Sequence, residues 1–439
     1  MSYETQCKMF SFGGYNMNFK RKLWWAQHRN EVYKYGTILS LVLVVTISII
    51  YFTYSKFSST NEVTAYETTV EPFIKNDYFI ASYIDGEWSD SIPGKDDGYV
   101  VDKIVCDNGA TATWNNEEWG INVRNETQKI KCNIYFVVKP LSAAEKITTL
   151  ATTDTTNFAT DDPDNNIRYI GADPSNYVYF NCSDYLNQND STCEKWRIIG
   201  VFKNMTKKDG TKEDLVKIIR NDFIWNIAWD DNSVNDWSIA TLQTTLNGDY
   251  YNGTYETGAF KNDLTRNAIE SIVWNLGGPE EEEYDSSSNG LASHWYGYER
   301  GTTVYDGNPT TWTGKIGLMY PSDYGYATSG NSTTNRAACL AKELYNWYTD
   351  EWENAEDCYS NDYLHSYSYD QWTLVPTSSV SNNSFLVNAN GDVSDYYVNY
   401  GSENGENSSA RPVAFLKSSI SISSLGDGTS SSPYQLKVG

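Results

Sequence analysis

The feature that most constrains this chain is an uncharged apolar stretch near its N-terminus. Residues 38–54 read ILSLVLVVTISIIYFTY, and no charged side chain occurs between Lys34 and Lys56. A bilayer core of about 30 Å requires roughly 20 helical residues, and residues 35–55 supply that length. Residues 37–54 are therefore predicted to form a transmembrane helix.

The charges around this stretch predict its orientation. The first 34 residues hold six basic and two acidic side chains, so the positive-inside rule places segment 1–36 in the cytoplasm. A cleaved signal peptide is the alternative, but FTYSKFSST after the stretch has no small-residue cleavage pattern. A type IV prepilin would need Glu five residues after Gly36, where Leu41 stands. The sequence thus predicts a single-pass protein of the cell membrane with an extracellular C-terminal part.

The acidic balance of the chain excludes one class of partner. Asp and Glu number 57 against 33 Lys and Arg, which gives a net charge of −24 at pH 7. The residues after Lys34 carry −28, because the first 34 are basic. Such a surface repels nucleic acid, whose binding depends on neutralised phosphates. No nucleic-acid partner is expected, whereas cations and basic partners are compatible with this charge.

Seven cysteines indicate a disulfide framework. Cys7 lies in the segment predicted to be cytoplasmic, where a thiol persists. The other six can pair in 15 ways, and proximity in sequence favours local loops, each worth roughly 3 kcal/mol. A zinc site is the weaker alternative, because no C-x-x-C motif occurs and only two histidines lie beyond the apolar stretch. The predicted pairs are Cys106–Cys132, Cys182–Cys193 and Cys339–Cys358.

Composition shifts divide the rest of the chain into four parts. Residues 55–75 are rich in Ser, Thr and Glu and are typical of a stalk. Residues 76–141 contain the strand-like runs YVVDKIVCDNG and KIKCNIYFVVK, which indicate a small antiparallel β-domain. Residues 142–166 are interpreted as a linker that ends in an acidic cluster. Residues 167–439 form the main domain.

The main domain combines strand and helix patterns, which predicts a β-rich α+β fold. Asp263 is a fair N-cap, and apolar residues follow it at roughly helical spacing. The expected strands are 176–181, 195–203 and 214–222, and the expected helices are 239–252, 262–276 and 334–349.

A series of motifs in this domain supports a family resemblance. They are WRIIGVF (196–202), LQTTLNGDYYN (242–252), GKIGLMYPSDYGYA (314–327), WTLVP (372–376), VNANGDV (387–393) and RPVAFLK (411–417). In their order they resemble an uncharacterised domain family of surface and secreted proteins of gut Firmicutes. That family is distantly similar to the superfold of C-type lectins and formylglycine-generating enzymes. The resemblance covers about residues 170–439 and implies a lectin-like α+β domain with long loops around a small twisted sheet.

The activities of that superfold do not carry over to this sequence. Calcium-dependent lectins bind sugar through Glu-Pro-Asn or Gln-Pro-Asp triplets, and neither triplet occurs. Formylglycine-generating enzymes need a reactive cysteine pair, for which no matching motif is present. His294 and His365 are interpreted as surface-loop histidines, and G-x-S-x-G, H-E-x-x-H and P-loop motifs do not occur. The sequence therefore predicts no enzyme, although an enzyme on the same superfold stays an alternative.

The recurring motifs supply the candidate ligand-binding residues, which are Trp372, Tyr324, Asp323 and Arg411. An arginine among aromatic rings is suited to gripping carboxylates or sugars. The structural alternative pairs Arg411 with a buried carboxylate such as Asp323. An extracellular glycan or protein ligand is the expected partner, and a structural envelope protein without a specific ligand is the alternative.

Calcium is the one metal that the sequence suggests. Asp161, Asp162 and Asp164 could bind Ca²⁺ through oxygen, but their spacing does not fit an EF-hand and a solvated acidic linker is the alternative. Asp427, between two glycines, fits a simple turn better than a calcium ligand. No other metal site and no organic cofactor is predicted.

Overall fold

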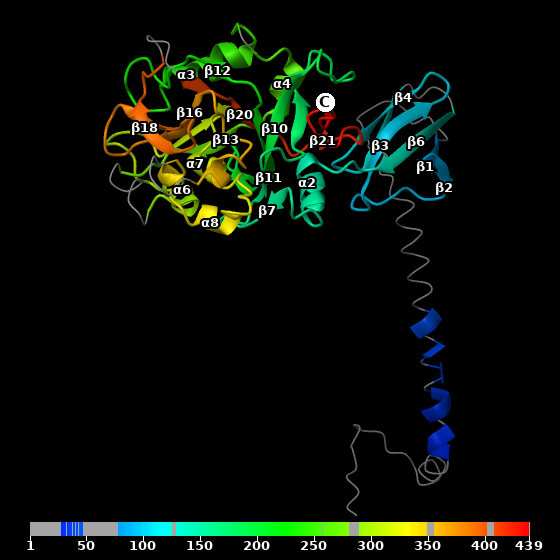
Figure 1. Cartoon of the computed structure of the whole chain (residues 1–439). Coiled ribbons are helices and arrows are strands. Elements are labelled where there is room, and N and C mark those ends of the chain that lie inside the picture. Colours follow the sequence, from blue (N-terminus) through cyan, green and yellow to red (C-terminus); the bar gives the residue numbers. More distant parts are fainter. Residues whose placement is uncertain are drawn as a thin grey trace, which may run out of the picture. The chain divides into compact units, whose positions relative to one another are not determined.

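The structure is a computed structural model, and Figure 1 shows the whole chain. It divides into two compact units, Met1–Lys139 and Pro140–Gly439, called here the N-terminal and the C-terminal unit. The described residues are 28–46 without 32, 37, 40 and 43, then 78–124, 129–256, 258–280, 289–348, 355–401 and 408–438.

The predicted transmembrane helix at residues 37–54 is wrong. The described residues between His28 and Thr46 are helical, but no helix in the described part of the chain is long and apolar enough to cross a membrane. A span requires roughly 20 apolar helical residues, and no described helix reaches that length. The single-pass membrane localisation and the cytoplasmic assignment of segment 1–36 are overturned with it. The predicted stalk, residues 55–75, and Cys7 lie outside the described residues.

The N-terminal unit contains a four-stranded sheet in the order β2-β1-β6-β3. Its strands are β1 (Tyr78–Ile84), β2 (Glu87–Ser89), β3 (Tyr99–Cys106) and β6 (Ile130–Val138). The predicted antiparallel arrangement needs a correction, because β1 and β6 pair in parallel and only β2 and β3 are antiparallel to their neighbours. Strand β1 is the first and β6 the last strand of this unit in the sequence, so a long connection joins them and they can run in the same direction.

Alternation along β6 explains how this sheet buries one face. Ile130, Cys132, Ile134 and Phe136 are buried and share that face. The hairpin β4 (Thr111–Asn115) and β5 (Gly120–Arg124) covers it. The rings of Trp114 and Trp119, from that hairpin and its turn, lie 5.4 and 6.2 Å from the ring of Phe136.

The C-terminal unit is built on two larger sheets. The first follows the order β15-β20-β11-β10-β8-β7, and β9 also pairs with β10. Its strands are β7 (Phe158–Ala159), β8 (Ile167–Tyr169), β9 (Tyr177–Phe180), β10 (Glu194–Thr206), β11 (Lys212–Arg220), β15 (Ile316–Gly317) and β20 (Val413–Leu416). The second, in the order β12-β19-β16-β17-β18, contains β12 (Ile224–Trp225), β16 (Asp370–Pro376), β17 (Asn383–Val387), β18 (Val393–Tyr397) and β19 (Ser408–Ala410).

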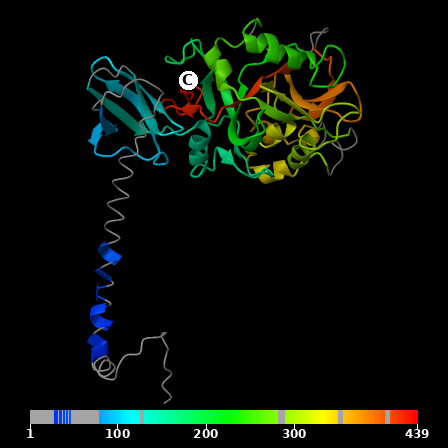
Figure 2. The same cartoon turned by 180° about the vertical axis from the view of Figure 1, so that it is seen from behind.

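Two short hairpins and a series of short helices complete this unit. The hairpins pair β13 (Ile272–Asn275) with β14 (Thr311–Gly314) and β21 (Ser421–Ile422) with β22 (Leu436–Lys437). The helices are α2 (Ala143–Ala151), α3 (Thr241–Thr245), η1 (Leu246–Tyr250), α4 (Asp263–Ala268), α6 (Ala292–Glu299), α7 (Pro321–Gly325), α8 (Arg336–Leu340), η2 (Leu344–Asn346) and α9 (Glu356–Tyr359). Helices α6, α7 and α8 lie on one side of the unit in both Figure 1 and Figure 2.

The segment predicted to be a linker, residues 142–166, belongs to the folded unit. Ser142 and Glu145 form a capping box that begins α2, and the segment also supplies β7. Ala143 and Ile147 are buried in the hydrophobic core of the unit. The Ser, Thr and Asp content that suggested a linker therefore reflects caps and turns rather than an unfolded connection.

The three predicted disulfides are confirmed. Their pairs are Cys106–Cys132, Cys182–Cys193 and Cys339–Cys358. Disulfides of this kind are typical of proteins that function in an oxidising compartment, outside the cytosol.

Candidate functional site

The four predicted ligand-binding residues are all buried in the C-terminal unit. The indole nitrogen of Trp372 donates to the carbonyl of Ile227 at 2.9 Å. The hydroxyl of Tyr324 donates to the carbonyl of Gly391 at 2.7 Å. Within the described residues, no hydrogen bond, ion pair or ring contact joins any two of the four. The structure therefore assigns Trp372 and Tyr324 to the core, while Asp323 and Arg411 belong to two separate polar clusters.

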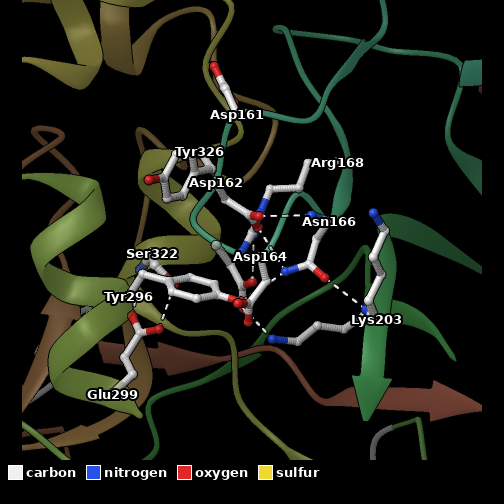
Figure 3. A network of polar contacts seen from close by, with 12 residues as sticks. Asp161, Asp162, Asp164, Asn166, Arg168, Lys203, Tyr296, Glu299, Ser322 and Tyr326 are labelled. Carbon is white, nitrogen blue, oxygen red and sulfur yellow. Dashed lines mark hydrogen bonds and ion pairs between the residues drawn. The ribbon is translucent and has the colours of Figure 1, made fainter. Parts of the chain in front are cut away.

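Asp323 belongs to a buried ionic network, part of which Figure 3 shows. One carboxylate oxygen accepts from Arg168 at 3.0 Å, and the other accepts from Lys217 and from the backbone N–H of Tyr320 at 2.8 Å. Arg168 also donates from Nε to Asp162 at 2.6 Å. The predicted alternative, a pair between Asp323 and Arg411, is wrong, because Arg168 and Lys217 take that carboxylate.

The charges of this network balance. It contains two cations, Arg168 and Lys217, and two carboxylates, Asp162 and Asp323, and all four are buried. Burial alone would raise the pKa of Asp323, but the adjacent Lys217 and Arg168 hold that pKa below its usual value. The network joins β8, β11 and the turn at α7, so it is a structural brace and has no free charge for a ligand.

The acidic cluster that suggested calcium is occupied by protein donors. Asp161 is paired with Arg336 at 2.7 Å. Asp162 is paired with Arg168, and Asp164 accepts from the hydroxyl of Tyr296 at 2.6 Å (Figure 3). Among the residues that the structure describes, no group of three His, Cys, Asp or Glu side chains could hold a metal ion.

Asp427 forms the turn that its glycine neighbours suggest. Its carboxylate accepts from the backbone N–H of Thr429 at 3.1 Å and from the Thr429 hydroxyl at 2.7 Å. These local hydrogen bonds explain why an Asp is suited to that position without a metal.

Arg411 belongs to the second cluster, and Arg197 lies in the same region. Arg197, on β10, lies between the rings of Tyr177 and Tyr363, at 3.7 and 4.9 Å from their centroids. Its Nε donates to Asn176 at 2.5 Å. The carboxylate that it contacts is Asp173, at 3.4 Å, whose side chain is 67% exposed. This contact is long and solvent-screened, so it neutralises Arg197 only weakly.

Arg411 follows β19 and is more isolated from negative charge. It donates from Nε to the side-chain carbonyl of Gln371 and from Nη2 to the backbone carbonyl of Leu364 at 2.6 Å. Its guanidinium lies 4.8 Å from the ring centroid of Phe223. Both acceptors are neutral, and Arg411 forms no ion pair within the described part of the chain. Its charge is therefore buried without a counter-ion.

The two guanidinium groups are called here the arginine pair, because Arg197 lies against the ring of Tyr363 and Arg411 donates to the carbonyl of the next residue, Leu364. Burial is the largest cause that lowers the pKa of Arg411, and the positive charge of Arg197 is the second. Arg197 is 5% exposed and Arg411 is 4% exposed. Two like charges thus share a region of low solvent access, which is an unfavourable arrangement in the absence of an anion.

The carboxyl of Asp362 lies near this pair but forms no ion pair with it among the described residues. One of its oxygens accepts from the backbone N–H of Leu364 at 2.8 Å, while the other is buried and has no hydrogen-bond partner among the described residues. Burial raises the pKa of Asp362 well above its usual value, despite the opposing charge of Arg411. Burial therefore favours the uncharged form of Asp362, and its carboxyl forms no ion pair with either arginine among the described residues.

Aromatic side chains form a partly exposed rim next to the arginine pair. Tyr177, Phe223 and Tyr369 are half-buried. Tyr177 contacts Arg197, Phe223 contacts Arg411, and the rings of Phe223 and Tyr369 lie 5.3 Å apart. The guanidinium groups are thus in contact with side chains that reach the surface.

Neither histidine offers an acid–base pair. His294 lies on helix α6 rather than in the predicted loop. His365 is half-buried beside the carbonyl of Ala389, at 3.2 Å from Nε2, and burial lowers its pKa to about 4. Within the described residues, neither ring is hydrogen-bonded to a carboxylate or a hydroxyl, an arrangement that general-base catalysis requires.

Comparisons with known protein families, with curated proteins and with solved structures find no match. The resemblance to a surface-protein family of gut Firmicutes and to the lectin-like superfold therefore stays a prediction. Reasoning from sequence identified Arg411 as a candidate ligand-binding residue but not Arg197 or Asp362. The available signal for both was their position next to aromatic residues, in KWRII and NDYLH.

Proposed function

We propose that the C-terminal unit is a binding domain for an anionic ligand whose negative group lies on the arginine pair. The observation that carries this proposal is the lack of a buried negative charge that would pair with Arg197 and Arg411. Both side chains are more than nine-tenths buried, and their protein partners are neutral acceptors or one exposed carboxylate. An oxyanion would neutralise the pair with charge-assisted hydrogen bonds, which are the strong ones.

The surroundings of the pair favour an acidic carbohydrate. Guanidinium groups match the geometry of carboxylate and sulfate oxygens. The half-buried rings of Tyr177, Phe223 and Tyr369 add apolar surfaces of the size of a sugar ring. A uronic acid or a sulfated sugar combines both requirements in one molecule. The three disulfides are consistent with a ligand that is met outside the cytosol.

The test measures binding of oligogalacturonate to the full chain by isothermal titration calorimetry, with the matching neutral galactose oligomer as the comparison. The variants Arg197→Met and Arg411→Met keep an unbranched apolar stem and remove the guanidinium with its charge. Arg266→Met is the matched control, because Arg266 forms an i,i+3 pair with exposed Asp263 on helix α4. Tyr177→Ala removes a rim ring and leaves both arginines in place.

We expect the wild type and the Arg266→Met variant to bind oligogalacturonate, and the Arg197→Met and Arg411→Met variants to lose about tenfold or more in affinity. Near-ultraviolet circular dichroism shows which variants keep the native fold. If an arginine variant does not fold, Tyr177→Ala decides the outcome on its own. Equal binding of neutral and acidic oligomers, or no binding of either, would refute the proposal and favour a structural role without a specific ligand.

A further inference from the structure

The sheet of the N-terminal unit has an open face that the arginine pair does not involve. The β4–β5 hairpin covers one face of this sheet, and the side chains at alternate positions point to the other. The large side chains of that open face, called here the aromatic face, are Phe79, Tyr83, Trp88, Lys103, Lys131 and Tyr135.

Strand pairing arranges these side chains in rows. Trp88 pairs with Tyr83, Tyr83 with Tyr135, and Tyr135 with Lys103, so one row crosses all four strands. The rings of Tyr83 and Tyr135 are stacked at 4.8 Å, and the ammonium of Lys103 lies 4.9 Å from the centroid of Tyr135. In a second row Lys131 lies 5.6 Å from the ring centroid of Phe79. The rows hold the rings and the ammonium groups in fixed positions.

Two of these rings are exposed to a degree that stability alone does not explain. Phe79 is 58% exposed and Trp88 is 65% exposed. Large rings gathered on a flat face indicate a surface that binds something, because water-exposed apolar area is unfavourable and promotes association. The buried face of the same sheet already supplies the core of this unit, so the rings of the aromatic face are not needed for that purpose.

The charge of the aromatic face differs from that of the chain. Its paired strand positions include Lys103 and Lys131 and no carboxylate, whereas the whole chain carries −24. Asp102 lies at a β-bulge and has no paired position. Lys103 and Lys131 are complementary to an anionic partner, repel a cationic one and give a neutral one no electrostatic attraction.

We propose that the aromatic face binds an acidic polysaccharide. Sugar rings would lie against Trp88 and Phe79, and their carboxylate or sulfate groups would meet Lys103 and Lys131. A repeating anionic polymer matches a sheet face that carries rings and cations in rows. This site is separate from the one in the C-terminal unit, and the inference does not rest on the function proposed there.

The experiment measures binding of the full chain to three immobilised polymers by surface plasmon resonance. Polygalacturonate has rings and charge, dextran has rings alone, and poly-L-glutamate has charge alone. The variants are Trp88→Ala and the double variant Lys103→Ala/Lys131→Ala. Their matched controls are Tyr397→Ala, an exposed ring in the C-terminal unit, and Lys203→Ala/Lys208→Ala, two exposed lysines there.

All of these variants are also made in the Arg197→Met background, which separates the two sites. We expect Trp88→Ala and the Lys103/Lys131 double variant to weaken polygalacturonate binding about tenfold in either background, and the controls to leave it unchanged. If Arg197→Met has no effect while Trp88→Ala does, the function proposed for the C-terminal unit fails and this inference stands.

Three results would overturn the inference. Polygalacturonate binding that is insensitive to Trp88→Ala would show that the rings do not take part. Equal binding of poly-L-glutamate would reduce the interaction to charge alone. A dimer in light scattering that Trp88→Ala converts to monomer would show that a second copy of the chain occupies the face. The variants replace exposed side chains, so circular dichroism is expected to match the wild type.

Discussion

Replacing Asp323 by Asn tests whether the buried ionic network braces the C-terminal unit. Asp323 accepts from Arg168 at 3.0 Å and also from Lys217, and all three side chains are at most 2% exposed. Asn keeps the volume but removes the charge, and it turns one acceptor into a donor that faces another donor. Two buried cations then share only Asp162, so the free energy of unfolding should fall by about 3–5 kcal/mol.

The assay is urea unfolding at pH 7 with the disulfides intact, followed by tryptophan fluorescence, which reports the buried indoles of the C-terminal unit. The matched control is Asp263→Asn, which breaks an ion pair of similar length with Arg266 whose carboxylate is 86% exposed. That control should cost less than about 1 kcal/mol. Adding Lys217→Met to Asp323→Asn should recover part of the loss, because it removes the cation that has lost its carboxylate. A cost below about 1 kcal/mol for Asp323→Asn itself would refute the reasoning.

Two further predictions follow from single residues. Burial raises the pKa of Glu299 from its usual 4.5 to about 7, so the folded state holds a proton that the unfolded state releases between these values. Stability should therefore rise as the pH falls from about 7 to 4.5, and Glu299→Gln should remove that part of the slope in urea titrations at successive pH values. A Cβ on Gly200 would lie 2.0 Å from the carbonyl oxygen of Ile167, at the pairing of β10 with β8, so Gly200→Ala should lower the thermal midpoint by several degrees. Gly248→Ala, with nothing within 4 Å of the added Cβ, should leave the midpoint nearly unchanged, and equal effects of the two substitutions would contradict the argument.

Local sequence signals predicted the strands better than the helices. The runs at 176–181, 195–203 and 214–222 became β9, β10 and β11, because β-branched and aromatic residues at these positions fit a buried sheet. The predicted helix at 262–276 is split, since α4 ends at Ala268 and β13 begins at Ile272. Apolar residues at that spacing are compatible with both a helix and a buried strand. In the structure, residues 272–275 form a strand that pairs with β14.

Two errors arose from reading composition without tertiary context. The apolar segment at 37–54 has the hydrophobicity of a membrane span, but no helix among the described residues is long and apolar enough to cross a membrane. The polar segment at 142–166 has the composition of a linker, yet Ala143 and Ile147 bury the inner face of α2. In short helices a few apolar residues decide the fold, and average composition conceals them.

The candidate site shows that sequence motifs did not predict which charged residues pair in the fold. Arg411 was identified because it recurs beside aromatic residues, and the sequence offered Asp323 as its partner. Asp323 pairs with Arg168 and Lys217, whereas Arg411 donates to the carbonyl of Leu364, next to the Tyr363 ring that Arg197 contacts. No local pattern specifies which buried cation receives a carboxylate and which does not. Asp162 and Asp323 balance Arg168 and Lys217, whereas Arg411 forms no ion pair among the described residues and Arg197 contacts only the exposed Asp173 carboxylate, so an anionic ligand would supply the counter-charge that these two arginines lack.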